Sequence, residues 1–457
     1  MILNKNEKLT VSIVDFGAKS GVEELQTASI QAAIDHCFLN GGGEVQIPEG
    51  EFYSAGFRLR SNVTLHLLKN AKLIGSLDCE DYFVLREDKL EPVPAFLFTP
   101  ETFTGLFRDR QHWGNRWYNS FIKAYNAKNI AVIGEEGSII DGRDCYDGDN
   151  EEGFRGPHCI SCNECENITF RGYTIINSAN WAHCNWFCKN IVCENVTVLA
   201  GHDAFDIFAS NNVHVRNCKF HSGDDCIAGY DNQDILIENC DLASSCSAFR
   251  FSATHAHIKN CKVEGNSKYV HRYTCTKEEQ RTRILLSDEE NPNHRYRMKS
   301  FYTFYGDYRL HIRQIPSDIL IEDCEIANPE KFFHYNFSGS EQWSSNLPLA
   351  QIKLKNIKVK NISLPAVAYG DKEVPFDVTY EGVSLELSDD YRDDCLFRTA
   401  NLKRFELKDF SVKNFKGVTV LRNYGKNEGE IIIQNATGIE GVPVVTETDE
   451  VFTVDMI

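Results

Sequence analysis

Residues 190–198 (NIVCENVTV) and 211–220 (NNVHVRNCKF) start a pattern that decides the fold. Each repeat has apolar residues at alternate positions, then a polar turn residue, then in most copies a cysteine and another apolar residue. Alternation with a period of two predicts β-strands rather than helices. The turn residues lie 22, 22 and 21 positions apart, at Asn195, Asn217, Asn239 and Asn260. The pattern continues at residues 234–242, 255–263, 318–326 and 351–359.

A nearly constant period in the low twenties predicts stacked coils. The alternate Ile, Val and Leu residues form an inward stripe, which each coil buries by stacking on the next. We therefore expect an all-β chain, a right-handed parallel β-helix, with residues 1–457 as one solenoid domain. A leucine-rich horseshoe is the rival architecture, but its Leu-rich consensus and helical return stretch are absent from the sequence.

The cysteines fit inside such a coil. A free cysteine behaves as a small buried apolar residue, and one column of the repeat contains Cys218, Cys240, Cys261 and Cys324. Three others, Cys159, Cys162 and Cys165, are spaced like a metal knuckle, but no second half of a tetrahedral set follows nearby. We therefore expect no metal and no cofactor. The odd total of 17 cysteines and the start MILNKNEKLTVSIV, which lacks an apolar core, lead us to expect a reducing cytoplasm.

Charge and hydropathy exclude two classes of partner. The net charge is −18, whereas nucleic-acid binding needs a basic stripe. No run approaches the ~20 apolar residues of a membrane span. An anionic substrate would need a local cluster of Arg and Lys against this negative field.

Three segments depart from the repeat. Residues 27–39 (TASIQAAIDHCFL) have helical apolar spacing and end at a glycine run, so we expect a helix that caps the N-terminal end of the coil. We predict that residues 91–118 and 272–297 are loops inserted into the repeat, near the cleft in which a ligand would bind. A capping box over 276–279 predicts a short helix within the second insertion.

Two aspartate pairs lie one repeat apart. GHDAFDIF carries Asp203 and Asp206, and HSGDDCIAGY carries Asp224 and Asp225. The interval from Asp203 to Asp225 is 22 residues, so superposed repeats place these two side by side on neighbouring coils. Crowded carboxylates are costly unless they bind a cation or move protons. We interpret the group as an active site, against the alternative of a structural cation site or turn caps.

Several stretches resemble the polygalacturonase family, glycoside hydrolase family 28, from about Val14 to about Ile326. They include VDFGAKSG, GGGEVQIPEGEF, NAKNIAVIGEEGSIIDG and NSANWAHCNWFCKNIVCENVTV. Members of that family are right-handed parallel β-helices that hydrolyse pectin-type polysaccharides with inversion. The resemblance implies the same fold and a glycoside hydrolase.

Four short motifs form the active site of that family. The Asn-Thr-Asp motif is Gly201-His202-Asp203 here, which keeps only the aspartate, and Gly-Asp-Asp is intact at 223–225. The Gly-His-Gly motif falls on 246–248, with Ser247 in place of the histidine. The Arg-Ile-Lys motif is matched by Arg297-Met298-Lys299 after a longer insertion. The pattern suggests an active hydrolase with altered sugar recognition.

The resemblance implies that Asp224 is the general acid, while Asp203 and Asp225 hold and deprotonate the water. Arg297 and Lys299 would contact a sugar carboxylate, and their alternation predicts that both project from one strand face. An ordinary solvated basic stretch is the alternative for this pair.

Other residues are candidates for substrate binding. Arg250 lies 44 positions after Asp206, which is two repeats, so both should lie on the same face of the coil. We expect Arg250 to form an ion pair with Asp206 rather than to contact substrate. His202 or His183 would replace the missing motif histidine, although most histidines are surface or turn residues. Of the aromatic candidates for stacking on sugars, Trp113 and Trp117 lie in the first insertion; Trp181 and Trp186 are expected to pack in the interior.

The leading interpretation is a cytoplasmic glycoside hydrolase, exo-acting on short α-linked galacturonide or rhamnose-containing pectin fragments. The substrate is then an anionic oligosaccharide, without nucleic-acid or membrane partners. One alternative is a lyase on the same fold, with calcium and an arginine base. The other is a non-catalytic, carbohydrate-binding β-helix.

Overall fold

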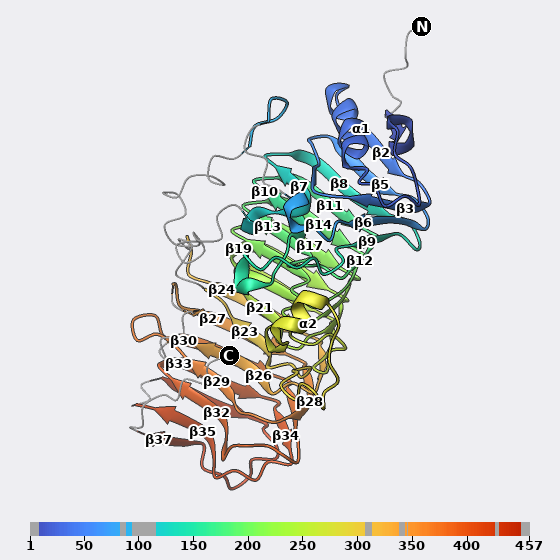
Figure 1. Cartoon of the computed structure of the whole chain (residues 1–457). Helices are drawn as coiled ribbons and strands as arrows, with labels where there is room; N and C mark the ends of the chain where they lie inside the picture. Colours follow the sequence, from blue (N-terminus) through green and yellow to red (C-terminus); the bar gives the residue numbers. More distant parts are fainter. Residues whose placement is uncertain are drawn as a thin grey trace. The chain divides into compact units, whose positions relative to one another are not determined.

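The computed structural model describes residues 9–82, 88–93, 116–306, 313–337, 343–344, 346–425 and 429–448. The chain, coloured along its sequence in Figure 1, divides into two compact units. The first unit holds Met1–Asp206, Ser210–Lys219 and Arg272–Asn293, and the second holds Ile207–Ala209, Phe220–His271 and His294–Ile457. None of the helices in these described ranges is both long and apolar enough to cross a membrane.

The first unit stacks parallel strands in three columns. Its first column contains β4 (Phe57–Arg58), β7 (Ser120–Tyr125), β10 (His158–Asn163) and β13 (His183–Trp186). Its second contains β1 (Thr10–Ser12), β2 (Gly43–Ile47), β5 (Val63–Leu67), β8 (Lys128–Gly134), β11 (Glu166–Arg171), β14 (Lys189–Glu194) and β17 (Asn211–Arg216). Its third contains β3 (Gly50–Ser54), β6 (Ala71–Gly75), β9 (Ile139–Asp141), β12 (Thr174–Ile176) and β15 (Thr197–Ala200).

The second unit repeats this arrangement, and two long strands, β19 (Ile227–Glu238) and β21 (Ser247–Lys259), take part in both its first and second columns. The first column continues through β23 (Ser300–Phe304), β26 (Lys331–Asn336), β29 (Ala366–Tyr369), β32 (Cys395–Ala400), β35 (Thr419–Tyr424) and β37 (Val445–Thr448). The second continues through β24 (Ser317–Glu322), β27 (Gln351–Lys355), β30 (Phe376–Glu381), β33 (Leu402–Lys408) and β36 (Glu430–Gln434). The third contains β20 (Asp241–Ala243), β22 (Lys262–Glu264), β25 (Glu325–Ala327), β28 (Lys358–Ile362), β31 (Ser384–Leu387) and β34 (Ser411–Lys413).

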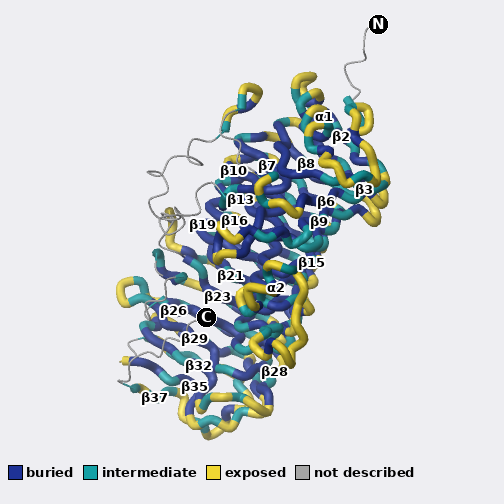
Figure 2. The backbone as a smooth tube through the Cα atoms, in the orientation of Figure 1, coloured by how far each residue is buried: buried dark blue, intermediate teal, exposed yellow. Residues whose placement is uncertain are grey.

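Two further strands, β16 (Phe205–Phe208) and β18 (Lys219–Ser222), contain residues of both units. Alternate residues along the strands are buried, as the dark segments of Figure 2 show. In β14, for example, Ile191 and Cys193 are buried between partly exposed neighbours. The predicted right-handed parallel β-helix is confirmed.

The backbone conformation at the polar turn positions explains why they are asparagines. Asn195, Asn217, Asn239 and Asn260 have φ between 54° and 56°, in the left-handed region that asparagine tolerates better than most residues. A second asparagine column forms an amide ladder in the first unit. Asn167 Nδ2 donates to Asn129 Oδ1 and Asn190 Nδ2 to Asn167 Oδ1, each at 2.8 Å. These contacts hold successive turns in register.

The cysteine column is also present, with its thiols inside the coils. Cys193 Sγ lies 3.8 Å from Cys218 Sγ in the first unit. In the second unit the Cys261 thiol hydrogen-bonds with the thiols of Cys240 and Cys324. Burial and these thiol contacts raise the pKa of Cys261, so the column is a stack of protonated, apolar-like side chains.

Both predicted helices form. α1 (Thr27–Leu39) buries Ile30, Ala33, Ile34 and Cys37 and packs on β2 and β4, so it covers the N-terminal end of the first unit. α2 (Lys277–Thr282) begins at a capping box, in which Thr276 Oγ1 accepts from the Glu279 N–H at 3.3 Å. Glu279 Oε2 accepts from the Thr276 N–H at 2.7 Å.

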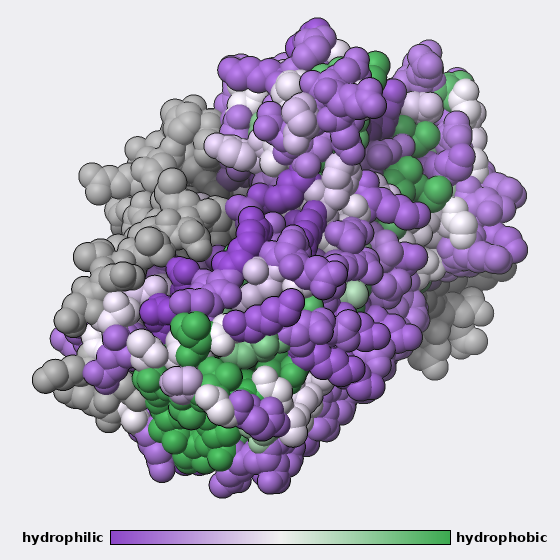
Figure 3. All heavy atoms as spheres, turned by 90° about the horizontal axis from the view of Figure 1, so that it is seen from below, coloured by the Kyte–Doolittle hydropathy of each residue, from purple (hydrophilic) through white to green (hydrophobic). Residues whose placement is uncertain are grey.

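β36 carries partly exposed isoleucines. In β36 the side chains of Ile431, Ile432 and Ile433 are only half-buried. Figure 3, which views the protein from below, shows a gathered apolar patch on an otherwise mostly hydrophilic face.

Candidate active site

The turns that precede β19 and β21 carry the acidic groups of the second unit. Asp224 and Asp225 directly precede β19, and Cys246 directly precedes β21. The turn is fixed from both sides, because the carbonyl oxygen of Asp224 accepts from Ser222 Oγ at 2.8 Å and from Ser244 Oγ at 2.6 Å. The two carboxylates are therefore presented by a rigid backbone.

Asp225 is the more deeply buried carboxyl, with 2% exposure. Burial, together with the negative charge of Asp224, raises the pKa of Asp225, and the positive charge of Arg250 offsets only part of this rise. Ser247 stands where the resembled family has histidine, and its hydroxyl lies 3.3 Å from the hydroxyl of Thr303.

Arg250 projects from β21 beside Asp225. Its Nη1 lies 3.6 Å from Asp225 Oδ2, and its Cζ lies 4.9 Å from the ring centroid of Tyr305 and 4.8 Å from that of Trp343. Because 18% of its side chain is exposed, it can meet a ligand while it is held between two rings. The structure thus pairs Arg250 with Asp225; the sequence predicted Asp206, which lies in the first unit.

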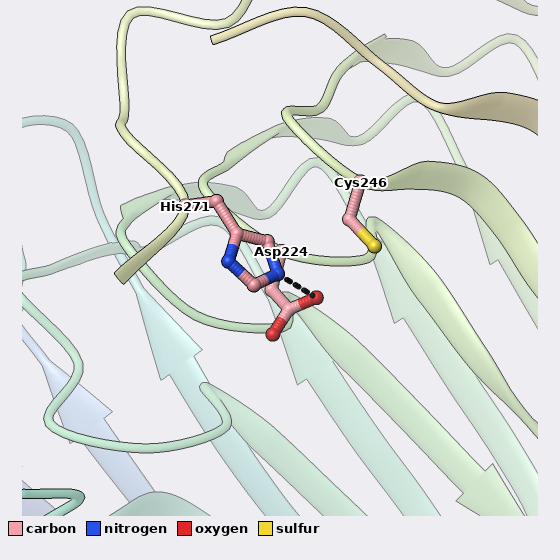
Figure 4. Close-up of side chains that lie close together, drawn as sticks. All are labelled: Asp224, Cys246 and His271. Atoms are coloured by element: carbon pink, nitrogen blue, oxygen red, sulfur yellow. Dashed lines mark ion pairs between the residues drawn. The ribbon is translucent and has the colours of Figure 1, made fainter. Parts of the chain in front are cut away.

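His271 is the partner of Asp224. It follows β22 on the way into the second insertion, and its Nε2 lies 3.3 Å from Asp224 Oδ1 (Figure 4). Cys246 lies beside this pair, and burial together with the two carboxylates raises the pKa of its thiol well above the usual value. Sequence reasoning missed both residues. Cys246 could have been found, because it lies 22 positions after Asp224; His271 lies where the repeat is interrupted and offers no such signal.

The Arg297-Met298-Lys299 segment does not place both cations together. The prediction that they share a strand face is wrong, because β23 begins only at Ser300. Arg297 instead donates to the carbonyl oxygens of Asn328 at 3.4 Å and Asn361 at 3.0 Å.

Burial and the positive charge of Arg295 lower the pKa of Lys299, while Cys246 opposes this shift. Arg295 donates from Nε to the Ser245 carbonyl at 2.8 Å. The positive charges of Arg295 and Arg250 partly offset the rise in the pKa of the Cys246 thiol.

The first unit carries Gly201-His202-Asp203, and Gly201 lies against a side chain of the second insertion. A Cβ atom on Gly201 would clash with the Arg272 side chain, which arrives from the second insertion. Arg272 Nη2 binds Asp144 Oδ2 at 2.5 Å. Because residue 201 is glycine, the insertion can lie against the turn that carries Asp203. Asp203 is itself buried.

His202 and His183 are both enclosed. The ring of His202 stacks on Phe154 with centroids 6.0 Å apart, and only 3% of the residue is exposed. His183 is fully buried inside the coil, where Nε2 contacts the Tyr173 hydroxyl at 2.8 Å and Nδ1 contacts the Ala204 carbonyl at 3.0 Å. Burial lowers the pKa of His183 to about 4. A core position prevents His183 from reaching a sugar.

Trp117 is also a packing residue in this structure. It is 2% exposed and meets the ring of Trp181 edge-on, with centroids 4.9 Å apart. Trp181 and Trp186 are buried, as expected. Trp113 lies outside the described residues. The aromatic rings beside the acidic turns are instead Tyr305 and Trp343, which the sequence did not single out.

Asp203 lies in the first unit and Asp224 and Asp225 in the second. Their juxtaposition stays a prediction of the 22-residue repeat. Among the described residues, the groupings able to ligate a metal ion within one unit include Asp224, Cys246 and His271.

Parts of the chain are similar in sequence to known proteins. The sequence model of Glycosyl hydrolases family 28 matches residues 106–246. A "Probable polygalacturonase" of Vitis vinifera is 26% identical over 241 residues, covering 50% of this chain and 46% of that protein. An "Exo-poly-alpha-D-galacturonosidase" of Dickeya chrysanthemi is 26% identical over 252 residues, covering 48% and 41%. The chain thus spans about half the length of the curated relatives it matches.

Two solved structures share the fold. An exopolygalacturonase from Thermotoga maritima superposes with a TM-score of 0.58 at 17% identity, covering 90% of this chain and 91% of that one. A polygalacturonase from Erwinia carotovora gives 0.56 at 16% identity, covering 87% and 96%.

Proposed function

From the membership of this chain in glycosyl hydrolase family 28, we propose that it hydrolyses α-linked pectin-type oligosaccharides with inversion of configuration. The observation that carries the proposal is the turn before β19. There Asp224 pairs with His271 at 3.3 Å while its neighbour Asp225 pairs with Arg250 at 3.6 Å. Two adjacent carboxyl groups thus have different partners, as distinct acid and base roles require.

The chemistry follows from these partners. Asp224 in its protonated form gives a proton to the glycosidic oxygen as the bond to the sugar breaks. Asp225, ionised beside Arg250, accepts a proton from the attacking water and afterwards releases it to solvent. The water oxygen becomes the new anomeric hydroxyl, and exchange with solvent returns a proton to Asp224.

The cations around the turn support an anionic sugar. Arg250, Arg295 and Lys299 gather within the second unit although the chain as a whole carries a net charge of −18. A local cationic cluster in an acidic protein suits a uronide carboxylate. Tyr305 and Trp343 provide aromatic faces next to it. We propose a galacturonide or rhamnose-containing fragment as substrate.

We also propose exo cleavage in the cytoplasm. The name of the Dickeya chrysanthemi relative supports an exo mode. The columns of buried free thiols support a reducing compartment. No cofactor has a role in the proposed steps.

A lyase on the same fold would need an unprotonated arginine as its base. The nearby carboxylates raise the pKa of Arg250 above its usual value despite burial, which counts against that role. Hydrolysis uses Arg250 as a fixed cation instead.

The test is incubation with a panel of pectin-derived oligosaccharides, followed by product mass and ultraviolet absorbance. A product that gains one water without new absorbance supports hydrolysis, and the panel member consumed identifies the sugar. A new absorbing product without added water would establish elimination. No product from any panel member would contradict the proposed substrate class.

A further inference from the structure

Three side chains with different ligand atoms converge beside the proposed general acid. A carboxylate oxygen of Asp224, Sγ of Cys246 and a ring nitrogen of His271 come from three separate turns of the second unit, and these three atoms all lie within 4.8 Å of one another. Figure 4 shows the carboxylate, thiol and imidazole around one region. Cys246 is 4% exposed, and the side chains of Asp224 and His271 are each 12% exposed. The group is sheltered from bulk water but open to a small ion.

The donor set matches one class of cation. Nitrogen, sulfur and oxygen donors together suit Zn²⁺ and its chemical relatives, whereas Mg²⁺ and Ca²⁺ take oxygen donors only. Bonds of about 2.0–2.1 Å at tetrahedral angles separate two ligand atoms by about 3.3 Å. The separation of Asp224 Oδ1 and His271 Nε2 is 3.3 Å. Three protein ligands leave the fourth position for water.

The backbone around all three ligands is held by hydrogen bonds. The Ser245 hydroxyl donates to the carbonyl oxygens of Tyr269 at 2.6 Å and Tyr296 at 3.1 Å, which anchors the segment of His271 to the turn of Cys246. The His271 N–H donates to the Arg295 carbonyl at 3.0 Å. Such support lowers the ordering cost of binding an ion.

Two carboxyl groups at this point attract a cation, whereas the positive charges of Arg250 and Arg295 oppose it. Asp225, the neighbour of Asp224, adds a second buried carboxyl group. Arg250 offsets it, but its guanidinium is directed to Asp225 rather than to the cluster of Asp224, Cys246 and His271. A divalent ion would also displace the thiol proton of Cys246, as metal binding to cysteine generally does.

We propose that Asp224, Cys246 and His271 form a binding site for Zn²⁺ or a similar thiophilic divalent cation, and that the bound ion blocks hydrolysis. The inhibitory part rests on the proposed function, because it requires Asp224 to be the general acid. A bound ion occupies the carboxylate and prevents it from carrying a proton. The concentration of free metal ion then controls turnover, because the ion binds reversibly at this one site.

Binding is tested on the full chain without substrate, after chelator treatment, by titration with Zn²⁺ in a calorimeter and with Co²⁺ in a spectrometer. The expected result is one site whose cobalt form shows thiolate charge-transfer absorption in the near ultraviolet. Cys246→Ser and His271→Gln should each weaken binding about 10–100-fold or more and, for Cys246→Ser, remove the band. The matched controls Cys261→Ser and His257→Gln should retain wild-type binding.

Equal Zn²⁺ affinity in wild type and Cys246→Ser, or a cobalt complex without the charge-transfer band, would overturn the site. Thermal melting of each variant separates loss of a ligand from loss of the fold. Asp224→Asn, which changes little in shape, gives a third variant expected to bind weakly.

Inhibition is measured as the ratio of turnover with and without Zn²⁺ within each variant. Wild type should lose turnover when Zn²⁺ is added and regain it with chelator. For Cys246→Ser, turnover at that Zn²⁺ concentration should equal its own turnover without Zn²⁺. Cobalt binding with the expected spectrum but unchanged turnover would overturn the inhibitory part alone. If the metal-free protein cleaves no panel sugar, the proposed function fails while the binding measurement still decides the site.

Discussion

The side chain of Arg272 occupies the space that a Cβ atom on Gly201 would need. Arg272 belongs to the insertion after β22, and it is held there by Asp144 at 2.5 Å. Gly201 stands where the resembled family has asparagine, and its lack of a side chain is what leaves room for Arg272.

Gly201→Ala should destabilise the protein by about 1–3 kcal/mol, because the new methyl group must push Arg272 from its place. Urea denaturation measures the free energy of unfolding. In an Arg272→Ala background the same change should cost at least about 0.5 kcal/mol less, since the clash is gone. Equal costs in both backgrounds would show that Arg272 does not fill this space.

Asp224→Asn should lower kcat on the cleaved oligosaccharide by about 10²–10⁴-fold, because the amide cannot supply the proton. The substitution is nearly isosteric, so the melting temperature should change little. Asp241→Asn, at an exposed carboxylate after Cys240, is the matched control and should leave kcat unchanged. Wild-type turnover by Asp224→Asn would refute the assignment of the general acid.

Arg250→Gln should reduce kcat/KM for uronide substrates by about 10–100-fold, the cost of one lost charge-assisted hydrogen bond. Substrates whose carboxylates are methyl-esterified should be affected less. Arg313→Gln removes another arginine–aspartate pair of the second unit and serves as the control. A similar loss for charged and esterified substrates would place Arg250 in support of Asp225 rather than in contact with the sugar.

His183 gives a stability that depends on pH. Its pKa is about 4 in the folded chain because burial disfavours the charged ring, whereas the ordinary value is 6.5. Between these values the unfolded chain binds more protons, so the contribution of His183 is intact above pH 6.5 and is lost as the pH falls toward 4. From pH 7 to pH 5 the loss is about 2 kcal/mol.

His183→Gln should remove that part of the pH dependence, whatever its effect at pH 7. Urea denaturation at pH 7 and pH 5 measures the difference for wild type and variant. His255→Gln, at a side chain that is 57% exposed, is the control. An unchanged slope in His183→Gln would mean that the ring is already charged in the folded protein.

The sequence determined the coil, because each structural requirement is local and recurs. Alternating apolar residues specify the inward stripe, and Asn195 and Asn217 specify turns with positive φ. The intact Gly-Asp-Asp placed Asp224 and Asp225 on a turn before a strand for the same reason. Each of these features is decided within one repeat of about 22 residues.

The tertiary structure decided the partners, because these come from segments outside the repeat. His271 reaches Asp224, and Arg272 reaches Gly201, across an interruption whose path no periodicity encodes. Arg297 was assigned to a strand face that does not exist, since β23 begins three residues later. The repeat period determines which residues share a column. Contacts between distant segments determine which side chains lie beside a charged group, and these neighbours set the chemistry of that group.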